Sequence, residues 1–155
     1  MILDGKVYKP TIIMDGERHG ICMIVLEMGT IGGITVAANV FAGKEELFSR
    51  LGIVNRKAMN RAAQEALDKI GASYIKAENK IDEESFENRK IVEIARAMFN
   101  DVKVLIIDET TTALSQKGRE LIYQIMNRLK DENKVVIFIS HDLDELTEHC
   151  NTVTV

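Results

Sequence analysis

Residues 103–141, KVLIIDETTTALSQKGRELIYQIMNRLKDENKVVIFISH, decide the fold of this chain. Two uninterrupted apolar runs, at residues 104–107 and 135–139, have the length of strands that are buried on both faces. Between them, residues 116–132 carry apolar side chains at helical spacing, and Ser115 is a suitable N-cap for that helix. This order predicts two parallel strands joined by a helix, and therefore an α/β domain.

The pattern continues on both sides of this stretch. Upstream, GICMIVL at residues 20–26 predicts another buried strand. The other predicted elements are a hairpin over residues 1–9, helices over 35–42, 56–71, 87–99 and 142–150, and a fourth strand over 151–155. We therefore expect a three- to four-stranded, mainly parallel sheet, with residues 35–100 inserted as a helical subdomain and residues 101–155 completing the core.

Composition excludes several classes of protein. The chain has 155 residues and a net charge of −4, and its lysines and arginines are scattered, which argues against binding nucleic acid. Two distant cysteines, Cys22 and Cys150, do not make a disulfide framework, so reduced thiols in a cytosolic protein are expected. No apolar run reaches the roughly 20 residues of a membrane span, so a membrane role requires a partner.

Two carboxylates follow the first strand of the quoted stretch. Asp108 and Glu109 come directly after VLII, at the strand end where open α/β sheets bind ligands. The first carboxylate can hold Mg²⁺ through water, and the second can activate an attacking water. The alternative interpretation is an acidic turn after an ordinary buried strand.

A histidine follows the second strand in the same way. His141 can contact a phosphate or a polarised water. Ser140 and Asp142, its neighbours, also suit the start of a helix, so an N-cap cluster is the alternative. Since one helix separates the two strands, adjacent parallel pairing places Asp108, Glu109 and His141 at one edge of the sheet.

These motifs together resemble the nucleotide-binding subunit of ABC transporters, above all the sugar-import branch and the first of its two tandem domains. Residues 103–109 resemble the Walker B strand, 112–115 stand at the D-loop, and His141 stands at the switch histidine. The segments VEIARA (92–97), ITVAANVFAGKE (34–45) and LDGK (3–6) resemble, in turn, the helix after the signature motif, the segment after the Q-loop and the hairpin after the P-loop helix.

The resemblance implies an ATPase that takes ATP and Mg²⁺ and works between two nucleotide-binding domains at the inner face of the membrane, bound to permease subunits. Asp108 would hold Mg²⁺ through water, Glu109 would activate water, and His141 would sense the γ-phosphate. Ser85 would face the nucleotide of the partner domain.

The chain departs from the family pattern at the groups that present the nucleotide. No G-x-x-x-x-G-K-[ST] motif occurs, and in the family that loop precedes the segment matching residues 3–6, so we expect a truncated chain that lacks Walker A. Leu26 stands at the Q-loop glutamine, although Glu27 would replace it after a one-residue shift. Glu87 stands at the signature glycine, where its charge is expected to repel a triphosphate.

Three hypotheses follow. The first is a fragment of the ATP-binding subunit of a sugar importer. The second is a degenerate, non-catalytic ABC-like module that acts through protein contacts, and the third is an unrelated α/β binding domain. Without a P-loop strand, residues 135–139 are expected at the sheet edge, where a homodimer or a terminal strand, residues 152–155 or 1–3, would pair with them.

Overall fold

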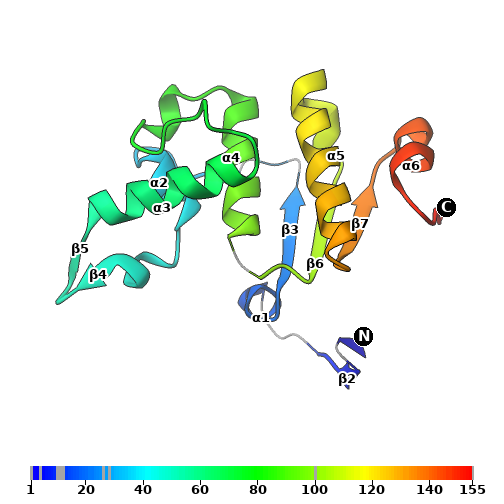
Figure 1. Ribbon diagram of the computed structural model, residues 1–155, viewed down its shortest axis with the longest axis horizontal. Coiled ribbons are helices and arrows are strands. Elements are labelled where there is room, and N and C mark those ends of the chain that lie inside the picture. The colour runs from blue at the N-terminus through cyan, green and yellow to red at the C-terminus, as the bar shows by residue number, and fades with distance from the viewer. Residues whose placement is uncertain are drawn as a thin grey trace.

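A computed structural model describes residues 2–3, 5–9, 13–25, 27, 29–99 and 101–154. Its centre is a three-stranded parallel sheet with the order β3-β6-β7 (Figure 1). The strands are β3 (Ile21–Val25), β6 (Val104–Asp108) and β7 (Val135–Ile139). The predicted α/β class, the parallel pairing and the neighbourhood of these three strands are confirmed.

The helices follow the predicted pattern closely. They are α1 (Ile13–Arg18), α2 (Val36–Val40), α3 (Arg56–Lys69), α4 (Phe86–Met98), α5 (Gln116–Asp131) and α6 (Leu143–His149). The 3₁₀ turns are η1 (Glu45–Phe48), η2 (Ile81–Glu83) and η3 (Thr110–Ala113). The predicted N-cap of α5 is confirmed, because the Ser115 hydroxyl accepts a hydrogen bond from the Gly118 amide. No helix among the described residues is long and apolar enough to cross a membrane.

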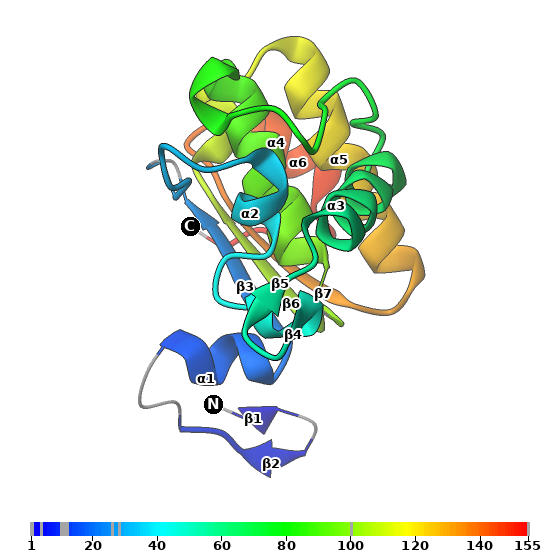
Figure 2. The same ribbon diagram turned by 90° about the vertical axis from the view of Figure 1, so that its left-hand side faces the viewer.

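The core lies between the sheet and the helices α2 to α5, which stand together on one side of it (Figure 2). Helix α4 packs against β3, and α5 packs against β7. Alternate strand residues point toward these helices, and among them Cys22, Ile24, Leu105 and Ile107 are buried. The continuous apolar sequences of the strands predict burial on both faces of the sheet. In the structure, the described residues cover only one of these faces.

The other face of the sheet is apolar and largely accessible. Met23, Ile106 and Ile137 lie side by side across the three strands by register. Met23 is 54% exposed and Ile137 is 45% exposed. Strand β7 also forms an edge, since β6 is its one hydrogen-bonded neighbour among the described strands. The edge expected from the sequence is therefore present, together with an open face.

Gly20 brings β3 and β6 together at their amino ends. Its carbonyl accepts hydrogen bonds from the amides of Lys103 and Val104. Its φ is +79°, and a Cβ there would lie 2.5 Å from the carbonyl oxygen of Asp101. Only glycine fits this close approach without displacing backbone.

The predictions for the two termini were partly wrong. Residues 151–154 form no strand, and the first strand, β1 (Ile2–Leu3), pairs with β2 (Lys6–Val7) instead of with β7. The hairpin at the N-terminus is therefore confirmed, but the described residues of neither terminus extend the three-stranded sheet. Met1 and Val155 lie outside the described residues. Isolated terminal residues lack the side-chain burial that would compensate for ordering them.

A second hairpin was not predicted. Strands β4 (Ser49–Arg50) and β5 (Ile53–Val54) pair around Leu51 and Gly52, which both have positive φ. Two-residue strands are too short for alternating hydrophobicity to reveal them.

Candidate functional site

The carboxyl ends of the three strands bring the predicted residues together. Asp108 pairs by register with Val25 on one side and Ile139 on the other. Glu109 follows Asp108, and its Oε1 lies 3.9 Å from Nδ1 of His141. Side chains 32 residues apart in sequence thus meet at one edge of the sheet, as their positions after adjacent strands predicted.

Glu109 sits in a constrained backbone conformation. Its φ of 49° is left-handed, which is uncommon for a residue with a Cβ. Its amide donates to the Ile139 carbonyl at 2.9 Å, and its own carbonyl accepts from the Thr112 hydroxyl at 2.8 Å. Backbone bonds on both sides therefore fix this residue, while its side chain remains 49% exposed. The backbone of Glu109 is thus fixed, and its carboxylate is accessible to water.

The turn after Glu109 is buried and hydrogen-bonded. Thr110 is fully buried, and its hydroxyl donates to the Asp108 carbonyl at 3.1 Å. Thr111 is equally buried, and its hydroxyl donates to Glu145 Oε2 at 2.9 Å. These bonds satisfy the hydroxyl groups of the two buried threonines.

Ser85 lies at the start of α4 and not among the carboxylates. Its hydroxyl caps the helix by accepting from the Asn88 amide at 3.1 Å. No contact within the described part of the chain joins it to Asp108, Glu109 or His141. Ser85 therefore does not belong to the cluster of Glu109 and His141. Its position at the start of α4 agrees with a contact to a second domain.

Glu87, at the signature-glycine position, binds within its own chain. Its Oε2 accepts from the Ser115 amide at 3.1 Å, and its Oε1 accepts from the Ser115 hydroxyl at 2.9 Å. A Cβ on Gly118 would lie 2.9 Å from that Oε1, so the glycine makes room for the carboxylate. The resemblance predicts that the Glu87 carboxylate faces a partner's nucleotide. In the structure, this carboxylate lies at the N-terminus of α5, where the helix dipole favours anions.

The segment after β3 is held by α4. Lys90 is fully buried, and its ammonium donates to the carbonyls of Val25 and Glu27 and, at 3.0 Å, to Glu93 Oε2. Glu93 Oε1 accepts from the Gly29 amide at 2.7 Å. Leu26, at the Q-loop position, lies outside the described residues, and the side chain of Glu27 is exposed. Sequence reasoning did not predict these contacts of Lys90, because a lysine in an amphipathic helix is usually exposed to solvent.

Oxygen donors at this edge suit Mg²⁺. The described residues contain no cluster of three or more metal-ligating side chains. Mg²⁺ needs none, since it is commonly held by one or two carboxylates together with waters and substrate phosphates. Asp108 places one such carboxylate at this edge of the sheet. Beside His141, a shallow cavity of about 450 Å³ is lined by Thr112, Arg119 and residues 141–145.

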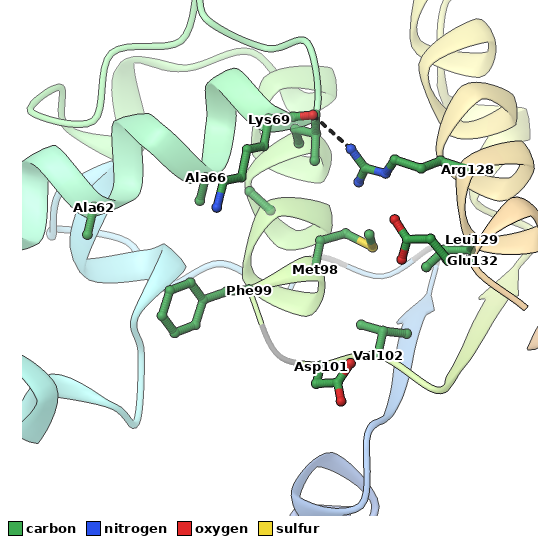
Figure 3. A pocket seen from close by; sticks show the side chains of 12 residues that line it. Ala62, Ala66, Lys69, Met98, Phe99, Asp101, Val102, Arg128, Leu129 and Glu132 are labelled. Atoms are coloured by element: carbon green, nitrogen blue, oxygen red, sulfur yellow. Dashed lines mark hydrogen bonds between the residues drawn. The ribbon is translucent and has the colours of Figure 1, made fainter. Parts of the chain in front are cut away.

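A different cavity, shown in Figure 3, lies at the opposite end of the sheet. It has a volume of about 330 Å³ and is lined by parts of α3, α4 and α5 and by Asp101 and Val102, which precede β6. The side chain of Arg128 in α5 lines this cavity and donates a hydrogen bond to the Lys69 carbonyl at 2.9 Å. Ligands of open α/β sheets bind at the carboxyl ends of the strands, so this cavity is not the candidate site.

His149 of α6 packs against α5. Its ring stacks on Tyr123 with centroids 3.7 Å apart, and its side chain is 19% exposed. Cys22 is buried in the core.

Tyr123 makes the stability of the chain sensitive to alkaline pH. Burial raises its pKa above the ordinary value, and its hydrogen bond of 2.6 Å to Glu145 Oε1 raises it further. Unfolded tyrosine ionises near pH 10, so above about that pH the folded state binds more protons and the free energy of unfolding falls as pH rises. We expect the urea midpoint to fall above about pH 10, and to fall less steeply in Tyr123→Phe. Identical slopes for the two proteins would contradict this.

The comparisons with known proteins agree with this geometry. A sequence model of the ABC transporter family matches residues 2–112. A ribose import ATP-binding protein of Rubrobacter xylanophilus is 36% identical over 155 residues, which are 100% of this chain and 30% of that protein. One from Bacillus cereus is 33% identical over 153 residues, 99% of this chain and 31% of that protein. The chain thus spans less than a third of the length of these curated relatives.

A solved structure shares the fold. Part of the ABC transporter complex cbiONQ from Clostridium perfringens superposes with a TM-score of 0.71 at 23% identity, over 97% of this chain and 59% of that chain. A family match over most of the sequence, with the two carboxylates and the histidine at one sheet edge, shows that the chain belongs to the ABC transporter family.

Proposed function

We propose that this chain is part of the ATP-binding and ATP-hydrolysing subunit of an ABC-type sugar importer, which couples ATP hydrolysis to sugar uptake. The observation that carries the proposal is the pairing of Glu109 with His141, 3.9 Å apart at the carboxyl ends of adjacent strands. The sugar-import relatives, which match along the whole chain, support the same function.

Each site residue has a role in this proposal. Asp108 holds Mg²⁺ through water, and the Glu109 carboxylate accepts a proton from the attacking water. His141 donates a hydrogen bond to the γ-phosphate, and Ser85 faces the nucleotide of a second domain. Bound Mg-ATP supplies the phosphoryl group, and catalysis consists chiefly of positioning and charge stabilisation.

The proposal includes partners and an arrangement of parts. The partners are a second nucleotide-binding domain and transmembrane permease subunits, at the cytoplasmic face of the membrane. Residues 35–100 would act as the helical subdomain, and residues 101–155 as the catalytic core. Helix α4 belongs to the helical subdomain and contacts β3 of the sheet, so it would transmit movement from that subdomain to the sheet.

A second candidate function is a non-catalytic ABC-like module that acts through protein contacts. One observation favours it. The signature position holds Glu87, whose carboxylate is bound to Ser115 of the same chain.

A chimera distinguishes the two functions. The 153 matching residues of the Bacillus cereus ribose import ATP-binding protein are replaced by the aligned part of this chain, and Mg-ATP binding, ATP hydrolysis and ribose uptake are measured. The unaltered relative is the positive control. Hydrolysis by the chimera supports the first function, whereas Mg-ATP binding without hydrolysis overturns it and supports the second.

The open sheet predicts self-association of the isolated chain. Exposed edges with apolar residues pair readily. Strand β7 forms such an edge, and its own residue Ile137 is accessible on the open face of the sheet. We expect sedimentation velocity to show dimers that are lost in Ile137→Lys. Leu51→Lys is the control, because Leu51 is 96% exposed but lies in the β4–β5 hairpin. A monomeric wild-type chain at high concentration would refute the homodimer.

A further inference from the structure

Glu145 lies beside the candidate site and has no role in the function proposed so far. It belongs to the first turn of α6, and its carboxylate accepts three hydrogen bonds from hydroxyl groups. The Thr111 hydroxyl donates to Oε2 at 2.9 Å and the Ser140 hydroxyl to the same oxygen at 3.0 Å. The Tyr123 hydroxyl donates to Oε1 at 2.6 Å.

The three donors come from separate parts of the chain. Thr111 is in η3, two residues after Glu109, and Ser140 directly precedes His141. Tyr123 is in the middle of α5, which packs against β7. One carboxylate therefore joins the segment carrying Glu109 to the segment carrying His141, and joins both to a helix of the core.

The position of Glu145 is itself fixed. Its amide donates to Asp142 Oδ1 at 3.3 Å, and the Asp142 amide donates to the Ser140 hydroxyl at 3.0 Å. Its side chain is partly buried, where hydrogen bonds to a charged acceptor are stronger than bonds between neutral groups. Burial of the Tyr123 phenol, together with its hydrogen bond to Glu145, raises the pKa of Tyr123.

We propose that Glu145 is a positioning residue that holds Glu109 and His141 at their mutual distance. Without it, the three hydroxyls lose their common acceptor. The backbone bond from the Glu109 amide to the Ile139 carbonyl still joins the two segments, but the side-chain link between Thr111 and Ser140 is lost. The catalytic consequence rests on the proposed function. The positioning itself does not, because it concerns the folded chain without nucleotide.

The test measures the contact between Glu109 and His141 in the chain itself, without nucleotide. The NMR signals of the His141 ring protons are identified by their loss in His141→Asn, and their response to Glu109→Gln is then recorded. We expect a clear chemical-shift response in the wild-type background and its loss in Glu145→Ala. The effect of Glu109→Gln is thus compared in the presence and in the absence of Glu145. This comparison is a double-mutant cycle, in which a non-additive effect shows that the two residues are coupled.

Two variants separate positioning from a general effect on folding. Glu145→Gln keeps the shape and one acceptor oxygen, so we expect it to retain part of the response. Glu148→Gln lies in the same helix with a side chain 77% exposed, and it should retain the full response. Circular dichroism and urea unfolding establish that each variant is folded, and an unfolded Glu145→Ala is replaced by Thr111→Val combined with Ser140→Ala.

The outcomes are distinct. A full response in folded Glu145→Ala, or an equal loss in Glu148→Gln, overturns the proposal. An inactive chimera alongside a response that depends on Glu145 would refute the ATPase function and leave the positioning role intact.

Discussion

Replacing Lys90 with methionine is expected to destabilise the chain by about 3–5 kcal/mol, the range for breaking a buried ion pair by removing one partner. Lys90 is fully buried, and its ammonium has three acceptors, which are the carbonyls of Val25 and Glu27 and the carboxylate of Glu93. Methionine fills similar space but donates nothing. Glu93, 6% exposed, would remain as a buried charge with the Gly29 amide as its remaining partner among these contacts.

Urea unfolding followed by circular dichroism measures this loss as a lower midpoint. Lys57→Met is the matched control, because Lys57 is exposed in the first turn of α3, and such surface changes are usually within about 0.5 kcal/mol. Removing both charges in Lys90→Met/Glu93→Leu should recover part of the loss, since paired replacement by apolar residues is often neutral. If Lys90→Met unfolds at the wild-type midpoint, the contacts by which Lys90 joins α4 to the segment after β3 do not stabilise the fold.

In a chimera that hydrolyses ATP, Glu109→Gln is expected to lower kcat by about 10²–10⁴-fold, the usual contribution of a general base. The amide has nearly the same shape as the carboxylate but cannot accept the proton of the attacking water. The backbone bonds to Ile139 and Thr112 involve the amide and carbonyl of residue 109, so the substitution preserves them. The affinity for Mg-ATP should therefore remain close to that of the parent chimera.

Steady-state hydrolysis and equilibrium nucleotide binding, measured on the same preparation, separate these two effects. Glu120→Gln is the control, because Glu120 is an exposed carboxylate of α5 that accepts a hydrogen bond from Gln116 in the same helix. Hydrolysis at an unchanged rate in Glu109→Gln would remove Glu109 from the catalytic role. A parallel loss in Glu120→Gln would show that the effect is not specific to the site.

The departure at Glu87 has a structural explanation that the sequence alone did not provide. The carboxylate replaces a glycine of the family pattern and binds Ser115, in a space that Gly118 leaves free. These three positions therefore belong together, although 28 residues separate Glu87 from Ser115. Their contact joins the start of α4 to the start of α5, next to the D-loop position.

The sequence by itself determined the elements whose signals are local. Continuous apolar runs produced β3, β6 and β7, and helical spacing with a capping Ser115 produced α5, because burial and capping act on neighbouring residues. The carboxylates and the histidine after adjacent strands were also predictable, since parallel strands end at one edge of a sheet.

Only the tertiary structure decided how distant side chains are satisfied. Lys90 and Glu145 looked like ordinary polar residues of amphipathic helices. The acceptors of Lys90 lie up to 65 residues away in the sequence, and the donors to Glu145 lie up to 34 residues away. No local sequence pattern could therefore reveal these contacts. Residues 151–154 failed to form the predicted strand for the same reason, because a strand requires a hydrogen-bonding partner that is set by the whole fold and not by its own sequence.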